Sequence, residues 1–256
     1  MPLTPERKRM EIFDGERLDG VNENLKLIQK TDGLTFGTDA YLLAAYMRGA
    51  KNARGAELGS GSGIVSMLCA EKGKLARIYA FEVQEDFAAL TSRNAALNGF
   101  ADRIKAVCAD VRDVKSTDTD GEVDVVFTNP PYMKTNAGRR NENDGKYIAR
   151  HEVCGNIGDF CAAANRLLRY GGLFYCVYRP DRLSDLISAM RENKLEPKKM
   201  TFVCADAAAP PSMVLVEAKK GGAAGLSVTP ALLVYSEASH LTETDRFKKI
   251  YEDCAF

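Results

Sequence analysis

Short apolar runs alternate with helix-like segments through most of this chain, from about residue 53 to residue 193. The runs "RGAEL", "RIYAFEV", "RIKAVCAD" and "EVDVVFTN" follow one another, and "QEDFAALTSRNAALNG" is one of the helix-like segments between them. Strands that alternate with helices form parallel sheets, because each helix carries the chain back across a face of the sheet. The pattern therefore predicts an α/β protein with a doubly wound, mostly parallel sheet.

The later segments continue this rhythm and then break it. A helix is predicted over 157–172 and a strand over 173–179, followed by a further helix in "DRLSDLISAMRENK". The runs "KKMTFVCAD" and "SMVLVEAKK" then come with no helix between them, which predicts an antiparallel pair that closes the sheet.

The first 52 residues have a different pattern. "RLDGVNENLKLIQ" predicts an irregular or hairpin segment, and "TDAYLLAAYMR" predicts a short helix. Because no repeat, low-complexity tract or Pro/Ser linker divides the chain, we interpret residues 1–256 as one domain with residues 1–52 as an N-terminal extension.

Composition excludes several functional classes. The 35 basic and 35 acidic residues cancel, so nucleic-acid binding would have to come from local patches. Only His151 and His240 are available, and the seven cysteines include no CxxC pair, so we expect reduced thiols and no metal site. The charged N-terminus lacks an apolar signal region and no stretch is long enough to span a membrane, which predicts a soluble cytoplasmic protein.

A glycine-rich stretch, "ELGSGSG" from Glu57 to Gly63, lies at the first strand-to-helix turn. Glycines there let a ligand approach the backbone, and the following helix offers free N–H groups. A phosphate-binding P-loop is excluded because no Gly-Lys-Ser/Thr follows, and Ile64 occupies the place of the third glycine of a dinucleotide fingerprint. A purely structural turn is the alternative interpretation.

Acidic residues end the next two predicted strands. Glu82 comes about twenty residues after the glycine loop, where a carboxylate can accept both hydroxyls of a ribose. Asp110 ends the third strand, where it could meet an adenine amine. Each residue alone could be a helix cap or a surface acid, but together they indicate an adenosine site at the carboxyl edge of the sheet.

The fourth predicted strand stops in Asn129-Pro130-Pro131-Tyr132. Prolines lack an N–H and push the preceding residue towards extended geometry, so the carbonyls there are held still without a ladder partner. An amide, a carbonyl and an aromatic face could together grip a flat group that carries an NH2. The alternative is a Pro-Pro turn with a packed tyrosine.

The four motifs "ELGSGSG", "FEV", "CADV" and "NPPY" in this order resemble the class I S-adenosylmethionine-dependent methyltransferases. NPPY is similar to the motif of the members that methylate planar nitrogens. The segments "FGTDAYLLAAY", "NENDGKYIARHE" and "LTETDRFKKIYED" extend the resemblance, over nearly the whole chain, to the tRNA(Val) anticodon-loop adenine N6-methyltransferases. This resemblance implies a Rossmann-like, seven-stranded sheet with an antiparallel C-terminal strand, S-adenosyl-L-methionine as cofactor, and the N6 amine of adenine 37 in tRNA(Val) as target.

The resemblance also implies roles for individual residues. The loop glycines would face the methionine portion of the cofactor, Glu82 the ribose and Asp110 the adenine, while residues 1–52 would close over the cofactor site. The implied catalytic residues are Asn129, Pro130, Pro131 and Tyr132, with Asn129 binding the target amine and Tyr132 stacking on the base. The implied cofactor-binding residues are Gly37, Thr38, Asp39, Glu57, Gly59, Gly61, Gly63, Glu82, Val83, Asp110, Val111 and Asn129.

A polar loop from Met133 to His151 follows this motif and carries five basic residues against two acidic ones. It leaves the candidate active site directly, which favours RNA binding over a merely solvated surface. Its basic residues are Lys134, Arg139, Arg140, Lys146 and Arg150. The pairs Lys198, Lys199 and Lys219, Lys220 are weaker candidates.

Two other substrates and one other class remain open. An amide nitrogen is also planar, so the chain could be a glutamine N5-methyltransferase acting on a protein such as a release factor. It could also methylate adenine or guanine in rRNA. A module that binds S-adenosylmethionine or RNA without turnover is the third alternative, against which the intact NPPY motif argues.

Overall fold

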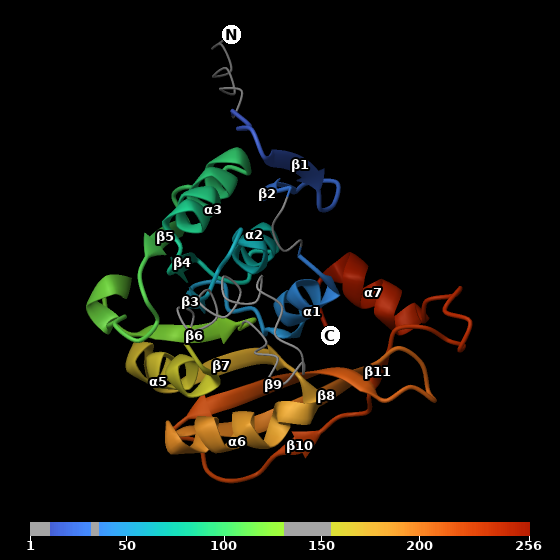
Figure 1. Ribbon diagram of the computed structural model, residues 1–256. Coiled ribbons are helices and arrows are strands. Elements are labelled where there is room, and N and C mark those ends of the chain that lie inside the picture. The colour runs from blue at the N-terminus through green and yellow to red at the C-terminus, as the bar shows by residue number, and fades with distance from the viewer. Residues whose placement is uncertain (1–10, 32–35, 131–154) are drawn as a thin grey trace, which may run out of the picture.

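The computed structural model of the 256-residue chain describes residues 11–31, 36–130 and 155–256 (Figure 1). One large sheet runs through it. Its seven long strands are, in spatial order, β5 (Ile104–Cys108), β4 (Arg77–Glu82), β3 (Arg54–Leu58), β6 (Val123–Thr128), β7 (Leu168–Tyr178), β9 (Pro211–Lys220) and β8 (Leu195–Cys204).

All neighbouring pairs among these strands are parallel except those that involve β9, which is antiparallel to both β7 and β8. The prediction of a doubly wound, mostly parallel sheet with an antiparallel C-terminal strand is therefore confirmed. The two-residue strands β10 (Ser227–Val228) and β11 (Leu232–Leu233) pair with β8 and bring the sheet to nine strands, two more than predicted.

Helices cover both faces of the sheet. The first face carries α1 (Thr38–Tyr46), α2 (Ile64–Glu71), α3 (Glu85–Leu97) and α7 (Asp245–Asp253), and the second carries α5 (Ile157–Leu167) and α6 (Leu183–Glu192). Two single-turn 3₁₀ helices, η1 (Ser116–Thr119) and η2 (Pro180–Arg182), lie in connections.

The core is divided between the two faces by the period of the strands. In β4, Ile78 and Ala80 belong to the cluster under α1, α2 and α3, whereas Tyr79 and Phe81 belong to the cluster under α5 and α6. Successive side chains of a strand point to opposite faces. Because both faces are covered, these strands are apolar almost throughout, as parallel strands are.

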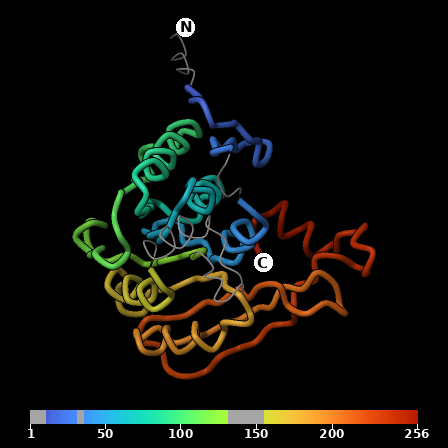
Figure 2. Tube along the Cα trace, viewed as in Figure 1, coloured from blue at the N-terminus to red at the C-terminus, as the bar shows by residue number. Residues whose placement is uncertain are grey.

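The hairpin that begins at Glu16 and the C-terminus both pack against the first face. An antiparallel hairpin of β1 (Glu16–Gly20) and β2 (Lys26–Lys30) confirms the hairpin prediction and lies beside α3 (Figure 1). The C-terminus returns to α1 (Figure 2). There the centroid of the Phe256 ring lies 5.0 Å from that of the Tyr46 ring in an edge contact.

The helix predicted over 157–172 is too long. The helix α5 ends at Leu167, and β7 begins at Leu168 instead of Leu173. The register between β6 and β7 shifts between Val123 and Val125, so the segment that contains Gly171 and Gly172 is a bulged strand. Gly171 has a φ of +76°, and a Cβ on Gly172 would lie 2.9 Å from the Arg169 carbonyl oxygen. Gly171 and Gly172, which were predicted from the sequence to end a helix, therefore lie inside the strand β7.

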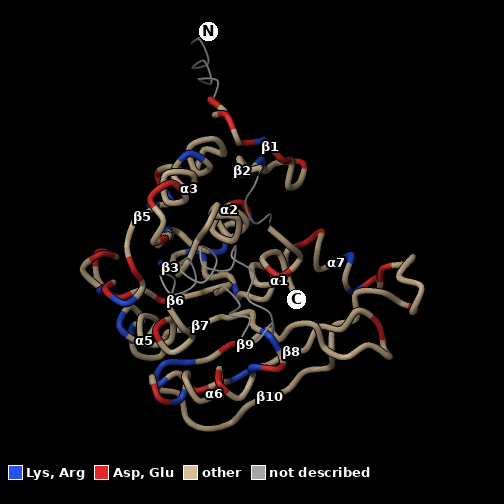
Figure 3. Tube along the Cα trace, viewed as in Figure 1, with Lys and Arg blue, Asp and Glu red and all other residues tan. Residues whose placement is uncertain are grey.

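Three further sequence expectations concern the surface and the cysteines. Basic and acidic residues are interspersed along the described chain (Figure 3). None of the helices within the described ranges is long and apolar enough to cross a membrane. Among the described cysteines, Cys108 is exposed and the other five are buried free thiols, as predicted.

Hydrogen bonds from Lys74 to the C-terminal end of α1 are expected to stabilise the fold. Its buried ammonium donates to the carbonyls of Ala44 (2.6 Å), Ala45 (3.2 Å) and Met47 (2.9 Å) at the end of α1, although burial lowers the Lys74 pKa. Lys74→Met should lower the free energy of unfolding by about 1.5 to 3 kcal/mol, measured by guanidinium denaturation, because hydrogen bonds to a charged group are lost.

Lys72→Met is the matched control, since the exposed Lys72 ammonium makes one 3.3 Å bond to the Glu252 carbonyl. Equal stabilities of the two variants would mean that the Lys74 hydrogen bonds merely offset the cost of burying its charge.

Candidate active site

Four neighbouring parallel strands, β6, β3, β4 and β5, end at the same edge of the sheet. Leu58 of β3 is in register with Thr128 of β6 and with Phe81 of β4, and Glu82 is in register with Cys108 of β5. The predicted site residues Asn129, Gly59, Glu82 and Asp110 end or follow these strands. The topology therefore brings them to one edge, where α/β sheets bind ligands.

The glycine loop follows β3 and needs its glycines. Gly59, Gly61 and Gly63 have φ values of +73°, +54° and +82°, in the left-handed region that side chains disfavour. A Cβ on Gly63 would lie 2.8 Å from the Thr91 Cγ2 atom, whereas a Cβ on Gly61 would meet nothing within 4 Å. Gly61 thus leaves an open approach to the loop backbone, which fits a ligand lying against it.

Glu82 ends β4 and joins the glycine loop directly. Its Oε2 accepts a hydrogen bond from the Gly61 N–H at 2.9 Å, and its Oε1 accepts one from the Gln84 N–H at 3.0 Å. A carboxylate can accept about four hydrogen bonds, so Glu82 retains capacity for hydroxyl donors. The residue is buried, and its carboxylate is held in place before any ligand arrives.

The side chain of Glu57 points to the first turn of α2. Its Oε2 accepts from the N–H of Ser66 at 3.1 Å and from the Ser66 hydroxyl, and both donors belong to the first turn of the helix. Burial raises the pKa of Glu57 to about 8, although the Ser66 hydrogen bonds act in the opposite direction. This carboxyl therefore caps the N-terminus of α2 from the neighbouring strand, a role that the sequence did not predict.

Asp110 lies two residues after β5 and pairs with Arg112. Its Oδ1 accepts from the Arg112 backbone N–H at 2.8 Å and from Nε at 2.9 Å. The hydrogen bonds from Arg112 hold the Asp110 pKa below its usual value. Of the adjacent valines, Val83 directly follows β4 and Val111 is buried in the core cluster under α5.

Asn129 directly follows β6 and contacts the N-terminal extension. Its Nδ2 donates to Oδ2 of Asp39 at 2.8 Å. Asp39 stands in the first turn of α1, directly after Thr38 and the N-cap Gly37, and Pro130 is buried beside Asn129. The Asp39 carboxylate therefore fixes the orientation of the Asn129 amide.

Several predicted residues lie outside the described residues: Pro131, Tyr132, Lys134, Arg139, Arg140, Lys146 and Arg150. Of the weaker candidates, Lys220 donates to the carbonyls of Asn165 and Leu168, and Lys199 lies over the Tyr46 ring. Within the described part of the chain, no cluster of three or more His, Cys, Asp or Glu residues could hold a metal ion.

A cavity of about 430 Å³ lies at the opposite edge of the sheet, where β3 and β6 begin. Lys198 and Lys219 line it, and its two carboxylates are both paired, Glu217 with Arg48 and Asp124 with Arg169. The cavity is thus lined by ion pairs and is separate from the candidate active site.

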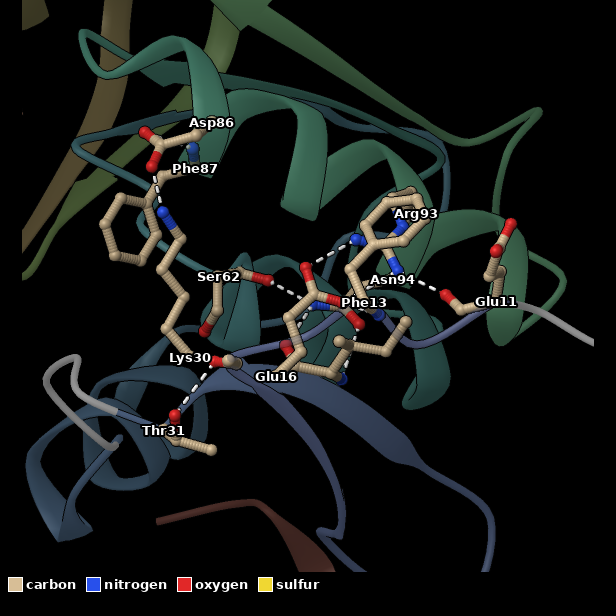
Figure 4. A network of polar contacts seen from close by, with 12 residues as sticks. Glu11, Phe13, Glu16, Lys30, Thr31, Ser62, Asp86, Phe87, Arg93 and Asn94 are labelled. Carbon is tan, nitrogen blue, oxygen red and sulfur yellow. Dashed lines mark hydrogen bonds and ion pairs between the residues drawn. The ribbon is translucent and has the colours of Figure 1, made fainter.

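Sequence reasoning missed two residues of α3 that hold the glycine loop. Thr91 Oγ1 donates to the Gly61 carbonyl at 2.8 Å. Asn94 Nδ2 donates to the Ser62 carbonyl at 2.9 Å (Figure 4). Both side chains are fully buried. Two polar residues three apart on the apolar face of a helix were the available signal, because buried polar groups need a partner.

Comparisons with known proteins show that the chain is similar to methyltransferases. The family model of the methyltransferase small domain matches residues 31–193, well over half of the chain. A protein of Parabacteroides distasonis named tRNA1(Val) (adenine(37)-N6)-methyltransferase is 27% identical over 80% of this chain and 81% of its own length. A protein of the same name from Porphyromonas gingivalis is 26% identical over 75% of this chain and 74% of its own.

A solved structure shows the same fold. A predicted O-methyltransferase from Agrobacterium tumefaciens superposes with a TM-score of 0.68 at 22% identity, over 85% of this chain and 97% of that one. The likeness confirms the Rossmann-like arrangement of the sheet and helices.

Glu57→Gln tests the buried carboxyl. Between its ordinary pKa of 4.5 and its folded value of about 8, the folded state keeps a proton that the unfolded state has lost. The stabilisation is complete below the unfolded pKa and is lost as pH rises through the folded pKa. Relative to Glu57→Gln, the free energy of unfolding of the wild type should therefore fall by about 1.4 kcal/mol or more, which corresponds to one pKa unit, between about pH 5 and pH 8.5.

Guanidinium denaturation of both proteins across this pH range measures the difference. Glu192→Gln, at an exposed position of α6, is the control and should follow the wild type at every pH. Parallel stability curves for the wild type and Glu57→Gln would show that the Glu57 pKa is not raised.

Proposed function

The chain belongs to the family of methyltransferase small domains, and on this premise we propose that it methylates the exocyclic N6 amine of an adenine in tRNA. It is an S-adenosylmethionine-dependent methyltransferase. One observation carries the proposal further: the amide of Asn129, at the end of β6, is oriented by Asp39 beside the glycine loop that Glu82 holds. This arrangement can present an amine to a methyl donor.

The proposed cofactor site uses the open side of the glycine loop. Gly59, Gly61 and Gly63 would let the methionine portion approach the backbone, and Glu82 would accept hydrogen bonds from the ribose hydroxyls. Asp110 would lie near the adenine, with Val83 and Val111 beside it, and residues 1–52 would close the site through Gly37, Thr38 and Asp39. Bound S-adenosylmethionine supplies an electrophilic methyl group.

The proposed amine site lies at Asn129. The N6 amine of adenine is a weak nucleophile because its lone pair is delocalised into the ring. Hydrogen bonds from its two hydrogens to the Asn129 amide oxygen and the Pro130 carbonyl would shift electron density to nitrogen. The lone pair would then form the bond to the methyl carbon as the sulfur–methyl bond breaks and leaves its electron pair on sulfur, and the nitrogen would release one proton to solvent. Placement supplies most of the acceleration, an effect worth about 7 to 11 kcal/mol.

The relatives suggest which RNA is the acceptor. Those reported above are named for adenine 37 of tRNA1(Val), so we propose the same nucleotide here, with Tyr132 stacked on the extruded base. A tRNA substrate also implies a cytoplasmic location. In this proposal, glutamine in a release factor and bases in rRNA are the competing acceptors.

A methyl-transfer assay with separate acceptors tests the proposal. Tritiated S-adenosylmethionine, total tRNA, rRNA and a release factor are each incubated with the enzyme, and the modified nucleoside is identified by mass spectrometry. We expect label in tRNA as N6-methyladenine. Label confined to release factor or to rRNA would replace the proposed substrate.

Asn129→Ala should abolish this transfer and leave cofactor affinity within a few fold, because its proposed role is to bind the amine. Calorimetry and the tritium assay measure the two effects. The matched control is Asn193→Ala, which removes an amide that bonds the Ala189 carbonyl at the end of α6. Transfer that survives at a tenth of the wild-type rate would remove Asn129 from the amine site.

Arg139 and Arg140 test the RNA contact. If both bind phosphates, replacing them with Ala should lower the slope of log affinity against log salt by about 1.4 to 1.8, because two counterion-releasing contacts are lost. A salt titration of tRNA binding measures the slope, and Lys248→Ala with Lys249→Ala on α7 is the control pair. Superimposable lines for the wild type and the arginine variant would mean that this loop is only solvated.

A further inference from the structure

Two asparagines, Asn94 of α3 and Asn98 at the C-cap of this helix, hold the N-terminal hairpin by its backbone. Asn94 accepts from the Ile28 N–H at 2.7 Å and donates to the Ile28 carbonyl at 3.0 Å. Asn98 makes the same two bonds to Lys26, at 3.0 Å and 2.7 Å. A side-chain amide has one acceptor and a donor like a peptide group, so each asparagine pairs with β2 as a residue of a neighbouring strand would.

The spacing explains why this pairing repeats. Four residues of a helix rise about 6 Å, and two residues of a strand span about 6.6 Å. Asn94 and Asn98 are four apart on one face of α3, and Lys26 and Ile28 are two apart on one edge of β2. The helix therefore matches the edge of the strand without distortion of either.

The two asparagines differ in their remaining hydrogen. Nδ2 of Asn94 also donates, at 2.9 Å, to the carbonyl of Ser62, which lies between two glycines of the glycine loop. Nδ2 of Asn98 instead donates to the Asn94 carbonyl within α3, at 2.8 Å. Asn94 thus bonds both the hairpin and the glycine loop, whereas Asn98 bonds the hairpin but not the loop.

Other contacts place the hairpin against α3. Arg93 pairs with Glu16 at 2.6 Å and lies over the Phe13 ring, and Lys30 pairs with Asp86 (Figure 4). The Arg93–Glu16 pair is partly buried and only Asp86 is exposed, so these contacts hold the hairpin against α3 beside the asparagines. Asn94 is fully buried, and a buried amide left without partners is unfavourable. The loop and the hairpin therefore have to be in place together to satisfy it.

The hairpin also leads to the amine site. The Phe36 N–H donates to Oε1 of the buried Gln29, at 3.2 Å. Three residues later Asp39 accepts from Asn129. Docking of the hairpin on α3 therefore fixes the start of the segment that orients the Asn129 amide.

We propose that Asn94 is a positioning residue that couples the docking of the N-terminal hairpin to cofactor binding at the glycine loop. The inference rests on the proposed placement of S-adenosylmethionine against that loop. A ligand that holds the loop with the Ser62 carbonyl towards Asn94 favours the docked hairpin. By reciprocity, the docked hairpin favours the ligand by the same factor.

Amide hydrogen exchange of Lys26 and Ile28, with and without saturating S-adenosylmethionine, tests the coupling. In the wild type, the cofactor should slow exchange at both amides by about 5-fold or more. Asn98→Ala should speed exchange in the free protein but keep the same response to the cofactor. Asn94→Ala should speed exchange and lose the response.

Two additional variants keep the test decisive. Asn94→Asp retains an acceptor for the Ile28 N–H but has no hydrogen for the carbonyls of Ser62 and Ile28, so it should also lose the response. Thr91→Val removes the hydroxyl bonds to the Gly61 carbonyl and to the Ser60 hydroxyl but no bond to the hairpin, and it should weaken cofactor affinity while the hairpin still responds. The amides of α6 serve as the internal reference in every variant.

The outcomes separate this inference from the proposed function. Failure of the wild type to bind S-adenosylmethionine in calorimetry would overturn the cofactor site itself. Normal binding, with equal responses of the hairpin in Asn94→Ala and Asn98→Ala, would overturn the coupling and leave the cofactor site intact.

Discussion

The parallel pairing of β6, β3, β4 and β5 is the constraint on which the rest of the structure depends. Parallel strands need a crossover between each pair, so helices cover both faces and the strands become apolar throughout. All four strands then end at one edge, where the chain must turn into the following helix or loop. The polar residues Asn129, Glu82 and Asp110 and the loop glycines therefore meet there, although they lie far apart in the sequence.

The glycine loop is held from two sides at once. Glu82 accepts from the Gly61 N–H, and Thr91 and Asn94 donate to the carbonyls of Gly61 and Ser62. Three left-handed residues in five would otherwise be a flexible segment with a high entropic cost of ordering. The side chains from β4 and α3 make the loop a preorganised surface, and among the described residues no atom lies within 4 Å of where a Gly61 Cβ would stand.

Glu57 and Glu82 are both buried near the loop, but their hydrogen-bond partners differ. Glu57 is enclosed under α2, where burial raises its pKa to about 8 and Ser66 supplies its hydrogen bonds. Glu82 keeps lone pairs available beside the loop. Both were predicted as cofactor-binding residues, Glu82 from its place at the end of a strand and Glu57 from the family resemblance. Both point to the same face of the sheet, but only Glu82, at the very end of β4, accepts a hydrogen bond from the loop, whereas Glu57 lies under Ser66 of α2.

The sequence by itself determined the class of fold, the strand ends and the positions of the glycines, since these depend on local periodicity and on backbone preferences of single residues. The tertiary structure decided the place of β9 between β7 and β8, the bulge at Gly171 and the end of α5 at Leu167. It also decided which side chains meet: Asp39 with Asn129, and Asn94 with both Ile28 and Ser62. These contacts join residues that are distant in the chain, and no periodic pattern records which distant partner will satisfy a buried amide.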